Sequence, residues 1–126
     1  MKEIKSNSLP TMECGMAYLA HPYASAFPDI NAFNLMDAGN IAFKIMRKYP
    51  NLTIISPLHA YSFLEGKELK ETEILKYDFR LLSRCDMLIL SGKWRNSNGC
   101  MAEYGYAKAK GIRIYEYRDG LLYPLE

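Results

Sequence analysis

Short apolar runs alternate along the chain with longer segments in which apolar residues recur every three or four positions. The runs at residues 15–20, 52–56 and 86–91 are aliphatic or β-branched and are bounded by turn-forming residues, so each predicts a buried strand. The alternating segment 112–117 predicts a fourth strand, and after a turn at 118–120 residues 121–124 predict a short edge strand or a docked tail.

The first segment with helical spacing begins near Pro28, with Asp29 as the expected capping residue, and fades at residues 47–50. Its expected buried stripe consists of Ala32, Leu35, Met36, Gly39, Ala42, Phe43 and Met46. A second helix is expected over about residues 68–84, with an acid, Asp78, among its inward apolar positions. A third helix is expected over 98–110, closed by Gly111. The connection 58–66 has no clear period and could form part of a site wall.

This alternation of strands and helices predicts an α/β fold with a mainly parallel sheet of four or five strands, arranged as a flavodoxin- or Rossmann-like three-layer sandwich. The length of 126 residues fits one domain with one core. Residues 1–12 are polar, and we expect them to be frayed.

Ligands of such sheets bind beyond the carboxyl ends of the strands. That edge would collect residues 21–25, His59 with Tyr61, and residues 94–99. At Ser97, Asn98 and Gly99 a strand passes into a helix, where free backbone N–H groups and the helix dipole favour an anion. Glu103 follows about one and a half turns later, so a carboxylate stands above this anion site.

Each candidate also has a structural explanation. Glu103 could be a solvated residue on a helix face, and Asp78 could pair with Arg80 or Arg84. Ser97 could be a simple helix cap, and Trp94 could serve packing.

Two isolated histidines, His21 and His59, make a poor metal site, and no metal is expected. The cysteines Cys14, Cys85 and Cys100 form no CxxC pair, which argues against a disulfide framework or a thiolate zinc site and favours a reduced, cytoplasmic location. A net charge of +2 without a basic run gives no support for nucleic acid or membrane as a partner. Residues 1–8 have no apolar core, so we expect no signal peptide, and no apolar run approaches the ~20 residues of a membrane helix.

Three motifs together resemble the nucleoside 2-deoxyribosyltransferase-like superfamily. They are Tyr18-Leu19-Ala20-His21-Pro22-Tyr23 after the first strand, Ser56-Pro57-Leu58-His59 after the second, and a W-x-x-S-x-G-x-x-x-E signature formed by Trp94, Ser97, Gly99 and Glu103. Asp78 and Cys85-Asp86 fall in the same order and spacing, so the resemblance covers about residues 16–117, nearly the whole chain.

The resemblance implies that Glu103 attacks C1′ of a nucleoside or nucleotide, that Asp78 assists the departing base and that Tyr18 orients Glu103. Ser97, with the backbone of Asn98 and Gly99, takes the place of the phosphate contact in relatives that hydrolyse nucleoside 5′-monophosphates.

His21, Tyr23, His59 and Trp94 are the remaining candidates for substrate contact. Phosphate-preferring relatives usually carry a glycine-rich loop with an arginine after the first strand, and this chain has neither at residues 21–25. Family sites are often completed by a neighbouring subunit, so a homodimer or higher homo-oligomer is expected.

These features predict an N-glycosidase that hydrolyses a (deoxy)nucleoside 5′-monophosphate, or a transferase that moves its sugar to another base, with no cofactor. The carboxylate would stabilise or capture the oxocarbenium-like centre formed as the glycosidic bond breaks. The alternative is a non-catalytic module that senses or sequesters a nucleotide in the same pocket.

Overall fold

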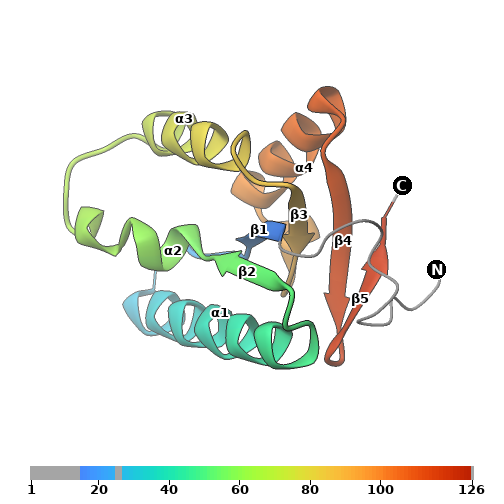
Figure 1. Cartoon of the computed structure of the whole chain (residues 1–126). Coiled ribbons are helices and arrows are strands. Elements are labelled where there is room, and N and C mark those ends of the chain that lie inside the picture. The colour runs from blue at the N-terminus through green and yellow to red at the C-terminus, as the bar shows by residue number, and fades with distance from the viewer. Residues whose placement is uncertain (1–14, 25–26, 126) are drawn as a thin grey trace.

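A five-stranded sheet forms the centre of the computed structural model, which describes residues 15–24 and 27–125 (Figure 1). The strands are β1 Gly15–Ala20, β2 Leu52–Ile55, β3 Met87–Leu90, β4 Arg113–Arg118 and β5 Leu121–Pro124, in the order β2-β1-β3-β4-β5. All neighbouring pairs are parallel except β4 and β5, which are antiparallel. The expected α/β class and mainly parallel sheet are therefore confirmed, and residues 121–124 form an edge strand.

Helices cover both faces of this sheet. They are α1 Pro28–Lys48, α2 Pro57–Ala60, α3 Glu71–Leu82 and α4 Asn98–Lys110, with 3-10 turns η2 Ser62–Leu64 and η3 Trp94–Asn96. Helix α1 lies on one side of the sheet, and α3 and α4 lie together on the other (Figure 1). This is the expected three-layer arrangement. Among the described residues no helix combines the length and the apolar character needed to cross a membrane.

Alternation along the central strands divides the core into two clusters. Ala17, Leu19, Met87 and Ile89 belong to the cluster on the α1 side, whereas the residues between them belong to the cluster that packs under α3 and α4. Successive strand residues point to opposite faces, so an unbroken apolar run is what a sheet covered on both faces requires.

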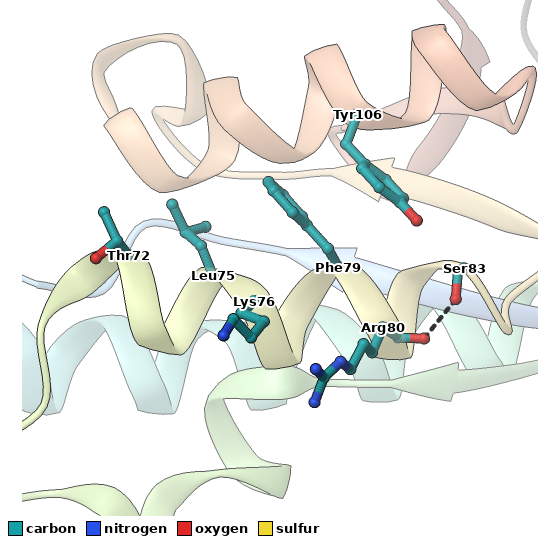
Figure 2. A pocket seen from close by; sticks show the side chains of 7 residues that line it. All are labelled: Thr72, Leu75, Lys76, Phe79, Arg80, Ser83 and Tyr106. Carbon is teal, nitrogen blue, oxygen red and sulfur yellow. Dashed lines mark hydrogen bonds between the residues drawn. The ribbon is translucent and has the colours of Figure 1, made fainter.

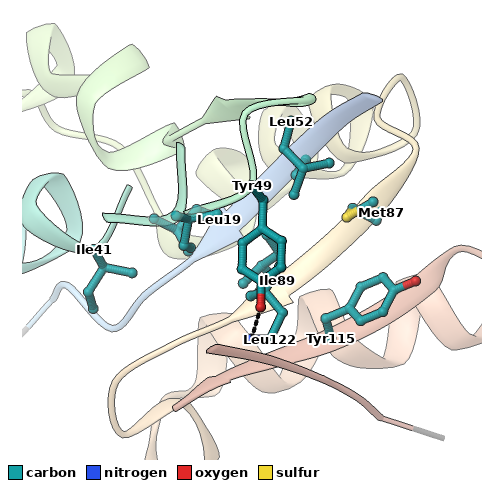
Figure 3. Packing of buried hydrophobic residues seen from close by; sticks show 10 residues of the cluster. Leu19, Ile41, Tyr49, Leu52, Met87, Ile89, Tyr115 and Leu122 are labelled. Atoms are coloured by element: carbon teal, nitrogen blue, oxygen red, sulfur yellow. Dashed lines mark hydrogen bonds between the residues drawn. The ribbon is translucent and has the colours of Figure 1, made fainter. Parts of the chain in front are cut away.

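The cluster on the α1 side extends to the last strand (Figure 3). Its Tyr49 follows α1 and is fully buried, and the hydroxyl oxygen of that residue accepts a hydrogen bond from the backbone N–H of Leu122 at 3.0 Å. This bond connects the end of α1 with strand β5 at the sheet edge.

Helix α1 buries a different stripe from the expected one. Its buried residues are Ala38, Ile41 and Ile45, whereas Met36 and Phe43 are 59% and 63% exposed. The expectation was wrong because α1 carries apolar residues around most of its circumference, so spacing alone did not select the inward face.

The start of α1 also differs from the expectation. Phe27 is the N-cap residue and makes no side-chain capping bond, while Asp29 lies in the first turn. There its carboxylate still complements the helix dipole.

The connection after β2 and the helix that follows it are more structured than their sequences indicate. The aperiodic segment contains α2 and η2, and α3 begins at Glu71 rather than near residue 68. The carboxylate of Glu73 accepts a hydrogen bond from the backbone N–H of Lys70, which fixes this later start. Helix α4 has the expected bounds and ends at Gly111, whose φ of 72° is left-handed.

Three sequence-based statements concern residues outside the described ones: the fraying of residues 1–12, Cys14, and Ser25 at the end of the loop after β1. The division of the chain into one domain likewise stays a prediction.

Candidate functional site

A buried hydrogen bond joins the central strand β1 to helix α4. Tyr18 lies near the carboxyl end of β1 on the face covered by α3 and α4, and its hydroxyl donates to Oε2 of Glu103. Tyr18 is fully buried and Glu103 is 5% exposed. The alternative of a solvated glutamate on the helix face is therefore excluded by its position.

A cavity of about 500 Å³ opens beside this pair. Helix α3 contributes Asp78 to its wall, so two carboxylates from successive long helices face one space. The other walls come from the loop after β1, from α2 and from the residues that begin α4. The sequence-predicted site residues that line the cavity are His21, Tyr23, Asp78, Ser97, Asn98, Gly99 and Glu103.

Burial controls the ionisation of the two carboxyl groups. Loss of hydration raises the pKa of Glu103 to about 8, a shift that the Tyr18 hydrogen bond opposes and the charge of Asp78 reinforces. Burial likewise raises the pKa of Asp78 to about 6, with the Tyr18 hydroxyl acting in the opposite direction. The pKa of Tyr18 is held far above its ordinary value by burial and by the two acids, so its hydroxyl remains a donor.

The carboxylate of Asp78 has an unsatisfied oxygen. Its Oδ1 is buried without a hydrogen-bond partner, and no ion pair joins Asp78 to Arg80 or Arg84 in the described part of the chain. A buried acceptor without a donor is costly, and such an atom in a cavity wall is suited to a donor brought by a ligand. The alternative explanation, in which Asp78 pairs with Arg80 or Arg84, is therefore not what the structure shows.

The N-terminus of α4 also lines the cavity. Ser97 is its N-cap, and the side-chain oxygen accepts from the backbone N–H of Cys100 at 3.2 Å. The first amides of a helix have no intrahelical acceptor, so those of Asn98 and Gly99 can donate to an anion, as can the Ser97 hydroxyl. Ser97 is thus both a cap and a possible ligand contact.

His21 is held by bonds at both ring nitrogens. Nδ1 lies 2.7 Å from the carbonyl oxygen of Pro22, and Nε2 lies 2.8 Å from Oδ2 of Asp37 on α1. Both ring nitrogens are therefore engaged by oxygens of the protein. The site wall therefore uses the face and edge of this ring.

Glycine is required opposite this histidine. Gly92 has a φ of 64°, and a Cβ there would lie 3.0 Å from His21 Nε2. The loop after β3 can approach the loop after β1 only because the side chain is absent.

Two predicted contacts lie elsewhere. The Trp94 side chain is 4% exposed and its Nε1 donates to Oε2 of Glu116 on β4 at 2.8 Å. The guanidinium of Arg95 stacks 4.2 Å from its ring centre and bonds to the same oxygen. Trp94 therefore holds the turn η3 to the sheet and does not line the cavity.

His59 is directed away from the cavity by the short helix α2. Its Nδ1 lies 2.7 Å from the hydroxyl of Ser56, and its exposed ring stands against Gly39 of α1. The motif after β2 places His59 near the correct sheet edge, but the first turn of α2 rotates the side chain towards α1.

Several residues of the site were not anticipated from the sequence. Cys100 and Glu71 line the cavity, Asp37 holds His21, and the hydroxyl of Tyr23 donates to Glu65. Asp37 could have been found as an acid near the inward face of an apolar helix. Glu65 lies in an aperiodic loop and carries no such signal.

A separate hollow of about 490 Å³ lies between the outer sides of α3 and α4 (Figure 2). The rings of Phe79 and Tyr106 are stacked there with centres 4.6 Å apart. Lys76 and Arg80 supply its charges, and neither Asp78 nor Glu103 lines it. It has no group suited to glycosidic chemistry and is distinct from the site at the sheet edge.

No group of three or more His, Cys, Asp or Glu side chains in residues 15–24 and 27–125 is arranged to hold a metal ion.

Comparison with known proteins gives a family match and similarity to solved structures. The model of a family described as "Domain of unknown function (DUF4406)" matches residues 46–116, more than half of the chain. No curated protein matches the chain. A 2-desoxiribosyltransferase from Leishmania mexicana is similar in structure, with a TM-score of 0.52 and 19% sequence identity over 89% of this chain and 79% of that chain. The structural similarity confirms the expected fold.

The raised pKa of Glu103 predicts a pH-dependent stability that can be measured without a substrate. From the ordinary value of 4.5 up to about 8, the folded protein binds a proton that the unfolded chain has lost. The free energy of unfolding therefore falls as pH rises through this window. Glu103→Gln removes the effect and should be more stable than the wild type at pH 9 by on the order of a few kcal/mol, with the difference vanishing near pH 4.

Urea unfolding at pH 4, 7 and 9 measures this difference, and the exposed Glu68→Gln is the matched control. A constant difference between wild type and Glu103→Gln across the three pH values would contradict the prediction.

Proposed function

Because the chain belongs to the DUF4406 family, whose function is unknown, its function has to be argued from the site, and we propose that it is an N-glycosidase. Its substrate is a (deoxy)nucleoside 5′-monophosphate, which it hydrolyses to free base and sugar phosphate, and transfer of the sugar to another base is the close variant. The observation that carries the proposal is that Asp78 and Glu103, the latter held by Tyr18, line one cavity together with the N-terminus of α4.

The residues match the steps of the reaction. In the first, an oxygen of ionised Glu103 forms a bond to C1′ while the bond from C1′ to the base nitrogen breaks, and Asp78 gives its proton to that nitrogen. In the second, Asp78 takes a proton from water, whose oxygen bonds to C1′ and releases Glu103. Tyr18 holds Glu103 in place throughout and donates to the oxygen that is not attacking.

The 5′-phosphate would lie at the start of α4. Ser97 and the amides of Asn98 and Gly99 supply donors, and the 13-residue helix supplies a favourable dipole. Within the described residues no lysine or arginine lines the cavity, so these donors have to carry the phosphate contact alone. No metal or organic cofactor is needed for this chemistry.

The 2-desoxiribosyltransferase of similar structure supports this class of reaction, since its name describes transfer of the sugar that a nucleoside carries. The unpaired thiols of Cys85 and Cys100 support a reducing, cytoplasmic location.

We expect base release from at least one member of a panel of nucleoside and deoxynucleoside 5′-monophosphates, with the matching nucleosides cleaved more slowly. Glu103→Gln keeps an acceptor for Tyr18 but removes the nucleophile, so the rate should fall at least about 10³-fold. Chromatography of the released base measures it, with Glu68→Gln as the matched control.

Equal and tight nucleotide binding by the wild type and Glu103→Gln, without cleavage by either, would instead favour a module that senses or sequesters the nucleotide. Exchange of the base that outpaces hydrolysis when free base is in excess identifies the transfer variant.

The two carboxyl groups predict a bell-shaped pH profile for kcat/KM. The active form holds one proton on the pair, with Asp78 protonated and Glu103 ionised. Because Glu103 has the higher pKa, this is the minor arrangement of that single proton. The rate should still rise as the pair loses its first proton near pH 6 and fall as it loses the second near pH 8. Asp78→Asn should lower the rate by about 10²–10⁴-fold and abolish the fall at high pH.

Removal of the Asp78 charge also lowers the pKa of Glu103, because that charge raises it. The pH profile of Asp78→Asn should therefore keep an ascending limb, and the apparent pKa of that limb should be lower than the pKa of about 8 of Glu103 in the wild type. A flat profile for the wild type over pH 5–9 would argue against the assignment of both carboxyl groups.

We further propose that the protein is a homo-oligomer, as expected from the resemblance. Support comes from apolar side chains at helical spacing on the outer face of α1, where Phe33, Met36 and Phe43 are 57%, 59% and 63% exposed. A charge in this stripe, Phe43→Glu, should dissociate the assembly, as measured by sedimentation velocity. The equally exposed Phe63→Glu is the control, and a wild-type monomer at micromolar concentration would rule the proposal out.

A further inference from the structure

A second cavity of about 420 Å³ adjoins the one that holds Glu103. The two cavities share the wall residues Tyr23, Pro57, Leu58, Ile74 and Asp78. Asp78 and Tyr23 therefore stand between the two cavities, with Glu103 and the start of α4 lining the first and residues of α2 and η2 lining the second.

The second cavity differs in character from the first. Apolar and aromatic residues form most of its lining, among them three leucines and two tyrosines, and Glu65 and Asp78 add carboxylates. Apolar walls with a few polar groups suit a flat heterocycle, whereas two acids would repel a phosphate.

The geometry of a nucleotide assigns its parts to these spaces. The base is attached to C1′ and the phosphate, through C5′, to C4′, the two carbons that flank the ring oxygen, so base and phosphate extend in different directions from the sugar. With the phosphate at Ser97 and C1′ beside Glu103, the base extends past Asp78 into the second cavity.

One polar group in that cavity is held in place by the protein. The hydroxyl of Tyr23, in the loop after β1, donates to Oε2 of Glu65, the residue that follows η2. This bond connects two separate loops, keeps Glu65 an acceptor and leaves Oε1 for another donor. Lys67 also lines the cavity, but its side chain makes no hydrogen bond or ion pair among the described residues.

We propose, on the basis of the function inferred above, that Glu65 reads the base by accepting a hydrogen bond from an exocyclic amino group. The preferred substrates are nucleotides of amino-bearing bases such as cytosine or adenine. The unpartnered Oδ1 of Asp78 gives a second acceptor at the mouth of the same cavity. Uracil and hypoxanthine present a carbonyl oxygen in place of the amino group, and its lone pairs would face those of Glu65.

The test compares two matched pairs, CMP with UMP and AMP with IMP, in which a carbonyl oxygen replaces the amino group and the neighbouring ring nitrogen gains a hydrogen. Dissociation constants are measured by calorimetry on Glu103→Gln, which does not turn the ligand over. We expect at least one pair to favour the amino member by about tenfold or more. Adding Glu65→Gln should reduce that ratio about tenfold, because an amide can donate to the carbonyl.

Tyr23→Phe should reduce the ratio by a smaller factor, since it frees Glu65 without removing the acceptor. The matched control is Glu68→Gln, which removes the same charge from an exposed position three residues along and lines neither cavity. It should leave the ratio unchanged.

Equal binding of both members of each pair, a ratio insensitive to Glu65→Gln, or no binding of any of the four nucleotides would each overturn the inference. Base release by the wild type is scored separately. If the wild type releases base but shows no preference for amino-bearing bases, only this inference is wrong. If amino-bearing nucleotides bind preferentially but no base is released, only the proposed function is wrong.

Discussion

The almost complete burial of the Glu103 carboxylate beside the cavity depends on one hydrogen bond, from the hydroxyl of Tyr18. Glu103 is 5% exposed, and the described structure gives it one hydrogen-bond donor, Tyr18. Desolvation disfavours its charged form and the hydroxyl bond favours it. The result is a carboxyl group that can exchange its proton near neutral pH, which an exposed glutamate does not do. Ionisation of Glu103 therefore lowers the free energy of unfolding.

The sheet makes this bond possible. Tyr18 can meet α4 only because β1 is a central strand between β2 and β3, with alternate side chains directed to opposite faces. Asp78 arrives on α3, which packs beside α4 on that same face. A parallel sheet thus brings residues separated by more than eighty positions together at one edge, where its helices begin.

The parts of the fold that follow from local patterns were predicted well from the sequence. The strands and α4 have nearly the expected bounds, because unbroken apolar runs and a Ser97 cap with a Gly111 stop are strong signals. The buried face of helix α1 was not predicted, because apolar residues lie around most of its circumference and their spacing does not identify the inward face. The selection of Ala38, Ile41 and Ile45 is made by the sheet.

The same distinction holds in the site. The presence of Asp78 and Glu103 in one cavity was implied by the resemblance to the deoxyribosyltransferase-like superfamily, whereas the pattern of the chain alone left the packing of the helix that carries Asp78 open. The directions of His59 and Trp94 do not, because they are decided by partners distant in sequence, Gly39 and Glu116. Sequence patterns place a backbone at an edge, but the side chain then turns to the available hydrogen-bond partner.

Trp94 shows how such a residue can matter without touching a ligand. Glu116 is 6% exposed and receives bonds from Trp94 and Arg95, so the turn η3 is tied to β4. Two residues later the chain reaches Ser97, whose cap sets the direction of the first amides of α4. Because an anion is bound by amides only when they converge, a loosened η3 would weaken phosphate contact while leaving Glu103 and Tyr18 in place. We therefore propose that the tryptophan of the signature supports the proposed anion end of the site and that the glutamate forms its reactive end.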